Sequence, residues 1–264
     1  MPKNIAHRGG AGLMPENTLA AFADALARSC DGAELDVQLS ADGEVVVHHD
    51  FRLMADVARK DDAWLTTPGP RIKDLTLAQL RQFDIGRPMP GSAYAAKHPM
   101  VTPVDGATVP TLKQVLDLIA ARPFTLMVEL KCDLSDDSAD PVALADAAFD
   151  VCAGSNNILF VGFDWRALTR IRARGGACWF TTDKLQGDAR PVIDMIAAAG
   201  GQGWFPSYLD ATPDNVAYAR EHGLKVGAWT VNDPADIQRL SGLDAICTDR
   251  PDLLHTLRQA QGEG

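Results

Sequence analysis

The sequence predicts an α/β fold, a single TIM (β/α)8 barrel, and three observations support this prediction. The chain of 264 residues is long enough for one such barrel. Short apolar segments typical of strands alternate with amphipathic segments typical of helices along most of the chain. The side chains able to do chemistry follow the strand segments, and a parallel barrel places its active site at those strand ends.

The first strand is expected at residues 4–7, and the helix after it has apolar residues at i, i+3, i+4 and i+7 from Leu19. The second strand begins at Gly32 and reaches a turn signal at 40–43. A β-branched segment, 44–47, then returns and leads to His48 and His49. A turn of this length is too short for a parallel crossover. We therefore expect a hairpin arm at 44–47 and not a ninth barrel strand.

The remaining barrel strands are each followed by a helix. Several of these helices begin at recognisable caps, such as Thr111 with Gln114 three residues later, or Asp140 before a proline. With the two strands above, this pattern gives eight parallel strands, and the later six are expected at 125–131, 157–162, 177–181, 203–206, 225–230 and 244–248.

Residues 51–109 interrupt the alternation, because prolines and glycines are frequent and only one short helix is indicated, at 76–83. No linker composition at either edge suggests an independent domain. We therefore interpret 1–264 as one domain with a long insertion at 51–109. The insertion leaves the barrel directly after His49, so we expect a cap over the active site whose aromatic residues influence the leaving group that is accepted, namely Trp64, Phe83 and Tyr94.

Composition excludes several classes of protein. The hydrophobic content of 46% and charged content of 23% are ordinary for a soluble globular protein. The net charge of −10 argues against nucleic acid or an anionic membrane surface as the main partner. The sequence shows neither a signal peptide nor an apolar run long enough to span a membrane, so a cytoplasmic location is expected. Whether the protein forms a homodimer stays open.

Three acidic residues lie in apolar strand segments, where an unpaired carboxylate is costly to bury. Glu34 and Asp36 are two residues apart and therefore point to one face of their strand. Glu129 and Lys131 repeat this spacing on the next barrel strand. A structural network of salt bridges with Arg8 is one interpretation. The other is a divalent cation site, for which three carboxylates favour Mg²⁺ or Ca²⁺ over zinc.

Two histidines, His7 and His49, end strand segments on the same rim as the acids. Their convergence predicts a pair of proton-transfer groups. His48 should point away from His49 on an extended arm, so we assign it to packing or to the surface. Trp229 could equally line the site or belong to the core.

A set of short motifs runs in order over nearly the whole chain: HRG at 7–9, PENT at 15–18, ELD at 34–36, HD at 49–50, ELK at 129–131, WTVN at 229–232 and TDRP at 248–251. Together they resemble the glycerophosphodiester phosphodiesterase family. The resemblance implies a TIM barrel with an insertion between the second strand and the second helix. After HD, members commonly continue with a leucine and an RTT run, which is absent here, so the preference for the leaving group stays open.

The resemblance also implies roles for the residues of the site. Glu34, Asp36 and Glu129 would hold a divalent cation, either Mg²⁺ or Ca²⁺, and His7 and His49 would be the acid–base pair. The substrate would be bound or supported by Arg8, Glu16, Lys131 and Trp229.

We therefore expect a metal-dependent phosphodiesterase that hydrolyses a small glycerophosphodiester to glycerol 3-phosphate and an alcohol. Whether the nucleophile is water or the glycerol 2-hydroxyl stays open. One alternative is an enzyme of the lysophospholipase D or sphingomyelinase D kind, although the insertion carries only scattered aromatic residues. The other is a catalytically inactive barrel that binds a phospho-ligand, and the intact histidines and acids argue against it.

Overall fold

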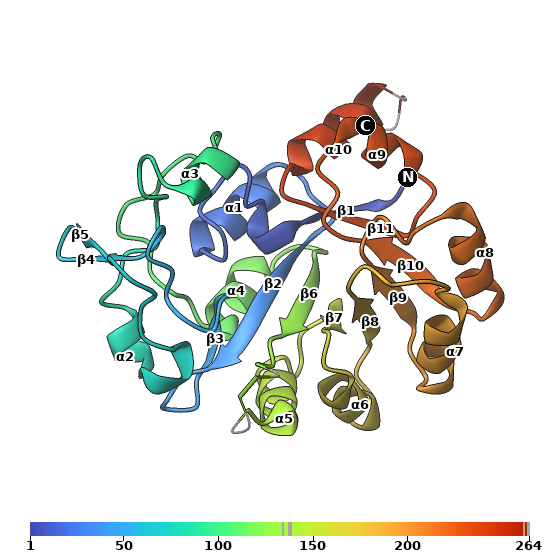
Figure 1. The fold of residues 1–264 in the computed structure, drawn as a ribbon, viewed down its shortest axis with the longest axis horizontal. Coiled ribbons are helices and arrows are strands. Elements are labelled where there is room, and N and C mark those ends of the chain that lie inside the picture. The colour runs from blue at the N-terminus through green and yellow to red at the C-terminus, as the bar shows by residue number, and fades with distance from the viewer. Residues whose placement is uncertain (134, 137–138, 261, 263–264) are drawn as a thin grey trace.

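The computed structural model describes residues 1–133, 135–136, 139–260 and 262. Eight parallel strands form a nearly closed barrel in the order β7-β6-β2-β1-β11-β10-β9-β8 (Figure 1). A parallel bridge between Phe160 and Cys178 connects β7 with β8. The predicted barrel is confirmed, and its strands are β1 (Lys3–Ala6), β2 (Gly32–Leu39), β6 (Thr125–Leu130), β7 (Ile158–Val161), β8 (Trp179–Thr182), β9 (Gly203–Pro206), β10 (Lys225–Ala228) and β11 (Ala245–Thr248).

Helices pack around the outside of the barrel, and the predicted caps are in place. Thr111 and Gln114 form a capping box, and the side chains of Asp140 and Asp164 accept hydrogen bonds from the first turns of their helices. The helices are α1 (Leu19–Ala27), α4 (Leu112–Ile119), α5 (Pro141–Val151), α6 (Trp165–Ala173), α7 (Arg190–Ala198), α8 (Pro213–Glu221), α9 (Pro234–Arg239) and α10 (Pro251–Ala260). In the described part of the chain, none of the helices combines the length and apolar character needed to cross a bilayer.

The hairpin arm after β2 is also confirmed. Strand β3 (Val45–Val47) pairs antiparallel with β2 and lies off the barrel path. The backbone N–H of His48 donates to the carbonyl oxygen of Asp36 at 2.9 Å. This pairing returns the chain from the turn beyond the end of β2, so His49 arrives beside the acids of β2.

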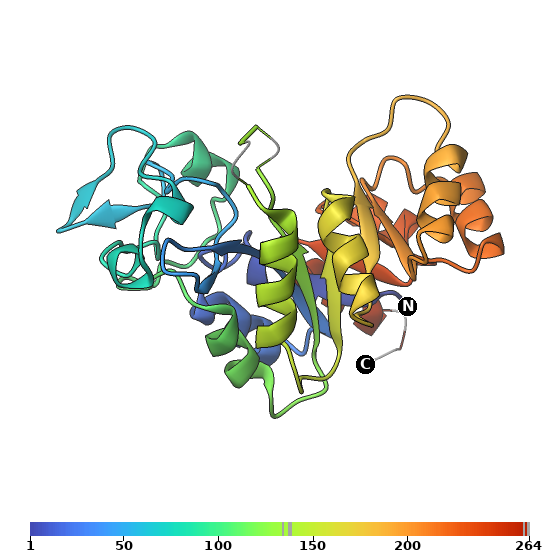
Figure 2. The ribbon, with the colours of Figure 1, turned by 90° about the horizontal axis from the view of Figure 1, so that it is seen from below.

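The insertion forms a lobe beside the barrel (Figures 1 and 2). It contains a small apolar core that includes Leu53, Ile72 and Leu80 and is continuous with Val46 of β3. The short helix expected at 76–83 is present as α2, but the hairpin of β4 and β5 and the helix α3 were not predicted, because such short elements carry little periodic pattern. The elements of the lobe are β4 (Arg59–Lys60), β5 (Ala63–Trp64), η2 (Ile72–Asp74), α2 (Leu77–Leu80) and α3 (Ala93–Lys97).

The aromatic residues of the insertion lie in different places. Trp64 packs under the guanidinium of Arg59, and Phe83 lies near the ammonium of Lys60, so both have partners within the lobe. Tyr94, on α3, instead donates a hydrogen bond to Glu16 of the barrel at 2.6 Å. Of these three aromatic residues, Tyr94 therefore makes the direct contact with a residue expected in the site.

Candidate active site

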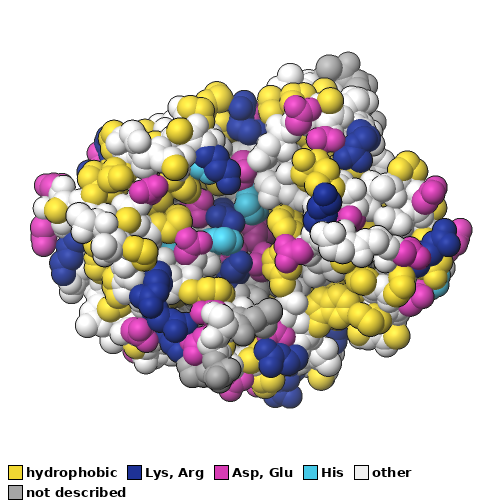
Figure 3. Space-filling model, in the orientation of Figure 1, with side chains coloured by type: hydrophobic (Ala, Val, Ile, Leu, Met, Phe, Trp, Pro, Cys, Tyr) yellow, Lys and Arg dark blue, Asp and Glu magenta, His cyan; other side chains and the backbone are white. Residues whose placement is uncertain are grey.

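The residues singled out by the sequence gather at the carboxyl ends of the barrel strands. Figure 3 shows histidine, acidic and basic side chains together at the centre of this face, where it is hollowed. A cavity of about 290 Å³ lies here, and its lining includes His7, Arg8, Glu34, His49, Glu129, Lys131 and Trp229. Asp36 and Glu16 are buried behind this lining, with 1% and 8% of their surface exposed.

Three carboxylates form the floor of the site. Strands β2 and β6 pair with Asp36 opposite Glu129, and Glu34 shares the face of Asp36 because it lies two residues earlier. One oxygen from each of Glu34, Asp36 and Glu129 lies within 4.8 Å of the other two. The sequence placed these acids on one rim, and the register of the barrel brings them into one cluster.

Glu34 is the least well paired carboxylate of the cluster. Its Oε1 atom is buried and has no hydrogen-bond partner among the described residues. Burial, together with the negative charges of Asp36 and Glu129, raises the pKa of Glu34 well above its ordinary value. The donor set consists of carboxylate oxygens, which are the ligands of hard divalent cations. An orphaned oxygen in such a set fits a cation that would complete it.

Two basic residues partner the acids. The Arg8 guanidinium donates to Glu16 at 2.9 Å and lies 3.4 Å from Asp36, and the Lys131 ammonium donates to Glu129 at 2.9 Å. Although burial alone would raise the pKa of Asp36, the charge of Arg8 is the largest opposing effect and the pKa is lowered. The salt-bridge network considered from the sequence is therefore present, but among the described residues it provides no partner for Glu34 Oε1.

The turn that carries His7 and Arg8 explains the first motif. Strand β1 ends at Ala6, one residue earlier than expected, and the chain enters the turn η1 (His7–Gly9). Arg8 and Gly9 have φ angles of +50° and +82°. A Cβ atom at Gly9 would lie 2.6 Å from the Cβ atom of Ala21 on α1. Glycine is therefore needed for this turn to pack against α1 and aim its neighbours into the cavity.

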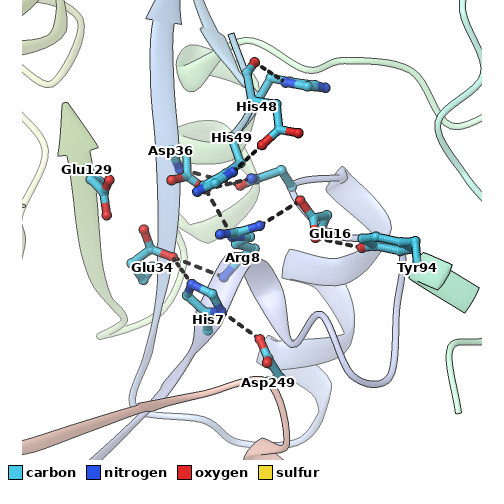
Figure 4. A network of polar contacts seen from close by, with 12 residues as sticks. His7, Arg8, Glu16, Glu34, Asp36, His48, His49, Tyr94, Glu129 and Asp249 are labelled. Atoms are coloured by element: carbon cyan, nitrogen blue, oxygen red, sulfur yellow. Dashed lines mark hydrogen bonds and ion pairs between the residues drawn. The ribbon is translucent and has the colours of Figure 1, made fainter. Parts of the chain in front are cut away.

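His7 is oriented by a residue that the sequence did not single out. Its Nδ1 donates to Asp249 Oδ1 at 2.6 Å, and its Nε2 lies 3.9 Å from Glu34 (Figure 4). Asn232 donates to the other oxygen of Asp249 at 2.7 Å. Burial opposes ionisation of Asp249, but the hydrogen bond and charge of His7 lower its pKa. Asp249 and Asn232 belong to the TDRP and WTVN motifs, which were the available signal.

His49 has a similar arrangement. Its Nδ1 donates to Asp50 Oδ1 at 2.6 Å, so the opposite ring nitrogen remains for a ligand. The side chain of Gln38 donates to the backbone carbonyls of His48 and Asp50 and thereby fixes this segment. Figure 4 shows the ring of His48 turned away from the acids, and its Nδ1 donates to the carbonyl of Asp50. His48 is buried and its burial lowers its pKa, which agrees with a packing role.

Two further polar residues, from outside the barrel strands, donate to acidic residues of the site. Asn17 donates to Asp36 at 2.8 Å, and Tyr94 donates to Glu16 at 2.6 Å. Burial and the charge of Glu16 raise the pKa of Tyr94, so its hydroxyl stays a donor. Asn17 lies in the PENT motif, whereas nothing near Tyr94 in the sequence indicates its contact with Glu16.

Trp229 forms part of an apolar wall opposite the polar side chains. Its ring packs edge-to-face against the ring of Phe163, with 5.3 Å between the ring centroids, and its indole N–H donates to the carbonyl of Phe205. Phe163, Phe205 and Trp229 all line the cavity. The residue is thus both packed into the barrel and exposed to the site.

Comparisons with known proteins identify relatives of this chain over nearly its whole length. A model of the glycerophosphoryl diester phosphodiesterase family matches residues 7–253. A probable glycerophosphodiester phosphodiesterase 1 of Mycobacterium tuberculosis is 36% identical over 95% of this chain and 90% of its own. The glycerophosphodiester phosphodiesterase of Caldanaerobacter subterraneus subsp. tengcongensis is 28% identical over 98% of both chains.

Solved structures of phosphodiesterases are similar to this chain over nearly its whole length. A crystal structure of a putative glycerophosphoryl diester phosphodiesterase from Silicibacter pomeroyi has a TM-score of 0.91 and 33% identity, covering 98% of this chain and 93% of that one. A phosphodiesterase of Oleispira antarctica, solved with the product sn-glycerol-3-phosphate, has a TM-score of 0.77 and 25% identity, covering 97% and 96%.

Proposed function

The chain belongs to the glycerophosphoryl diester phosphodiesterase family and hydrolyses glycerophosphodiesters, and we propose that it does so by acid–base catalysis between His7 and His49 beside a divalent cation. The products would be glycerol 3-phosphate and an alcohol. The observation that supports this proposal most strongly is the cluster of three carboxylates next to the two histidines. One of these carboxylates, Glu34, has a buried oxygen without a hydrogen-bond partner among the described residues.

Glu34, Asp36 and Glu129 would hold the cation, and either Mg²⁺ or Ca²⁺ suits an all-carboxylate set. When bound, the cation would act as a Lewis acid that polarises a phosphoryl oxygen and reduces the charge facing the nucleophile. Its charge would also oppose the two effects that raise the pKa of Glu34, namely burial and the negative charges of Asp36 and Glu129.

Hydrogen bonds to carboxylates orient the two histidines, so that one could accept a proton and the other could donate one. Each has its Nδ1 committed to a carboxylate, Asp249 for His7 and Asp50 for His49, so each presents its Nε2 to a ligand. One imidazole would take the proton of the nucleophile, either water or the glycerol 2-hydroxyl, and the other would protonate the leaving alkoxide.

The remaining site residues would bind the phosphate and the glycerol. Arg8 and Lys131 bring positive charge into the cavity, which an anionic substrate needs on a protein of net charge −10. Glu16 fixes the Arg8 guanidinium through their 2.9 Å contact. The apolar wall around Trp229 offers a surface for the carbon atoms of the glycerol moiety.

We also propose that the chain is a single domain and that the insertion acts as part of the active site. Its apolar core is continuous with Val46 of the barrel hairpin, and Tyr94 reaches the Arg8–Glu16 pair. The alternative of an inactive binding barrel has no support, because every group that the proposed chemistry requires lies in or behind one cavity.

The experiment is hydrolysis of glycerophosphocholine by the metal-stripped protein, with and without Mg²⁺ or Ca²⁺, followed by coupled detection of glycerol 3-phosphate. Glu129→Gln should lose activity and calorimetric cation affinity while keeping its fold. Glu44→Gln, the same change at an exposed position, should match the wild type. Full activity of Glu129→Gln, or release of glycerol 2-phosphate or phosphate in place of glycerol 3-phosphate, would refute the proposal.

A further inference from the structure

The insertion reaches the catalytic machinery through the side chain of Tyr94, on α3. The Tyr94 hydroxyl donates to Glu16 Oε2 at 2.6 Å, and Glu16 Oε1 accepts from the Arg8 guanidinium at 2.9 Å. Figure 4 shows these three side chains in a row from α3 to the centre of the site. Tyr94 is thus connected to Arg8, which lines the catalytic cavity, although the proposed proton transfers give its hydroxyl no role.

The ring of Tyr94 has a fixed position on the lobe. It packs against the apolar core of the insertion, and its centroid lies 4.6 Å from that of the buried His98 ring. The lobe is also tied to the loop before Glu16, because the backbone N–H of Thr102 donates to the carbonyl of Leu13 at 2.8 Å. The hydroxyl of Tyr94 therefore approaches Glu16 from a direction that the folded lobe determines.

The nitrogens of the Arg8 guanidinium are used unequally. Nη1 donates to Glu16, and Nε lies 3.4 Å from Asp36 without a hydrogen-bond partner among the described residues. Nη2 likewise donates no hydrogen bond to the described part of the chain. Because Arg8 lines the catalytic cavity, Nη2 is the nitrogen that remains for an oxygen of the substrate phosphate.

This arrangement depends on Glu16 meeting Arg8 through a single oxygen. A carboxylate whose two oxygens are both free tends to pair with a guanidinium through two parallel hydrogen bonds. Glu16 is buried, so water offers little competition for its second oxygen. Without the Tyr94 hydroxyl, we expect Oε2 to turn to Arg8 Nη2 and occupy the nitrogen that the phosphate needs. A carboxylate already held beside the guanidinium competes effectively with a ligand from solution.

We propose that Tyr94 is a positioning residue: by engaging one oxygen of Glu16, it keeps the second terminal nitrogen of Arg8 available for the phosphoryl group of the substrate. This inference rests on the proposed function, in which Arg8 binds the phosphate. It gives the insertion a role at the phosphate, the part that all glycerophosphodiesters share whatever their leaving alcohol.

The first test measures the calorimetric Kd of glycerol 3-phosphate in the presence of Mg²⁺ or Ca²⁺, because this ligand has the phosphate but no leaving alcohol. Tyr94→Phe should raise this Kd about tenfold, the loss expected for one hydrogen bond between charged groups. KM for glycerophosphocholine and KM for glycerophosphoglycerol should rise by the same factor, with kcat little changed. The matched control is Tyr218→Phe, which removes a hydroxyl that donates to Asp194 at 2.9 Å on the outer helices.

A second test adds Tyr94→Phe to Glu16→Gln. An amide has one acceptor oxygen, so it cannot form the bidentate pair with Arg8. The added change should therefore alter the Kd of glycerol 3-phosphate by less than about twofold, which makes the two substitutions non-additive. If Tyr94 only stabilised the lobe, its replacement would change the Kd by the same factor in both backgrounds.

The inference is wrong if folded Tyr94→Phe keeps the wild-type Kd, if KM changes for only one of the two substrates, or if the two substitutions are additive. It is also wrong if the wild type does not bind glycerol 3-phosphate with either cation. A wild type that binds glycerol 3-phosphate but hydrolyses neither substrate would refute the proposed function, whereas the Kd values would still decide the role of Tyr94.

Discussion

Replacing Asp249 by asparagine should reverse the tautomer of His7. The Oδ1 atom of Asn232 accepts hydrogen bonds from the backbone N–H of Asp249 and from the hydroxyl of Thr248. Its amide nitrogen must therefore face the side chain of residue 249. In Asp249→Asn the new amide oxygen would turn to Asn232, and its NH₂ group would face His7 Nδ1. The ring proton would then move to Nε2, the nitrogen that should exchange a proton with the substrate.

The expected loss can be estimated from this geometry. A wrong tautomer removes the contribution of one general acid–base group, which is about 10² to 10⁴ in rate. The cavity keeps its shape and charge near the phosphate, so the loss should appear in kcat more than in KM. The side chain of Asp249 is 13% exposed. The hydrogen bonds that its charged carboxylate accepts should contribute up to about 3 kcal/mol to the free energy of unfolding.

The stability effect has a defined dependence on pH. Because the folded-state pKa of Asp249 is lowered, its contribution is complete above the pKa of an unfolded aspartate, about 3.9, and is lost as the pH falls through the folded value. The difference in unfolding free energy between wild type and Asp249→Asn should therefore be large at neutral pH and shrink in strong acid. Urea denaturation at several pH values measures it.

The assay is steady-state hydrolysis of glycerophosphocholine, with circular dichroism to verify the fold. Asp252→Asn is the matched control, because Asp252, on α10, is paired with Arg250 and does not line the cavity. A folded Asp249→Asn variant that retains kcat within about threefold of the wild type would refute the role given to Asp249, because a general acid–base group contributes far more.

Two further predictions concern the cation and the histidines. EDTA should remove activity, and full activity after dialysis against EDTA would contradict the cation site. When a cation is titrated into the weakly buffered wild type, a proton should be released because the pKa of Glu34 is raised. The variant Glu34→Gln should release none. His7→Ala and His49→Ala should each lower kcat/KM at least about a hundredfold, and the wild-type kcat/KM should be bell-shaped in pH. His48→Ala should cost little activity because its ring is hydrogen-bonded to backbone away from the cavity, and a loss equal to that of His49→Ala would show that the hairpin arm was misread.

The sequence by itself determined the barrel and much of the candidate site. Alternating strands and capped helices follow from local periodicity, which depends only on neighbouring residues. The spacing of Glu34 and Asp36 placed both on one strand face for the same reason. A turn too short for a crossover identified β3 as a hairpin arm. These features need no knowledge of distant contacts, and the structure confirms them.

Only the tertiary structure decided which distant groups meet. Asp249 is 242 residues from the His7 it orients, and Tyr94 is 78 residues from Glu16. Barrel closure brings the first pair together, and the packing of an irregular insertion brings the second. Neither depends on a repeating local pattern, so no periodicity could have indicated them.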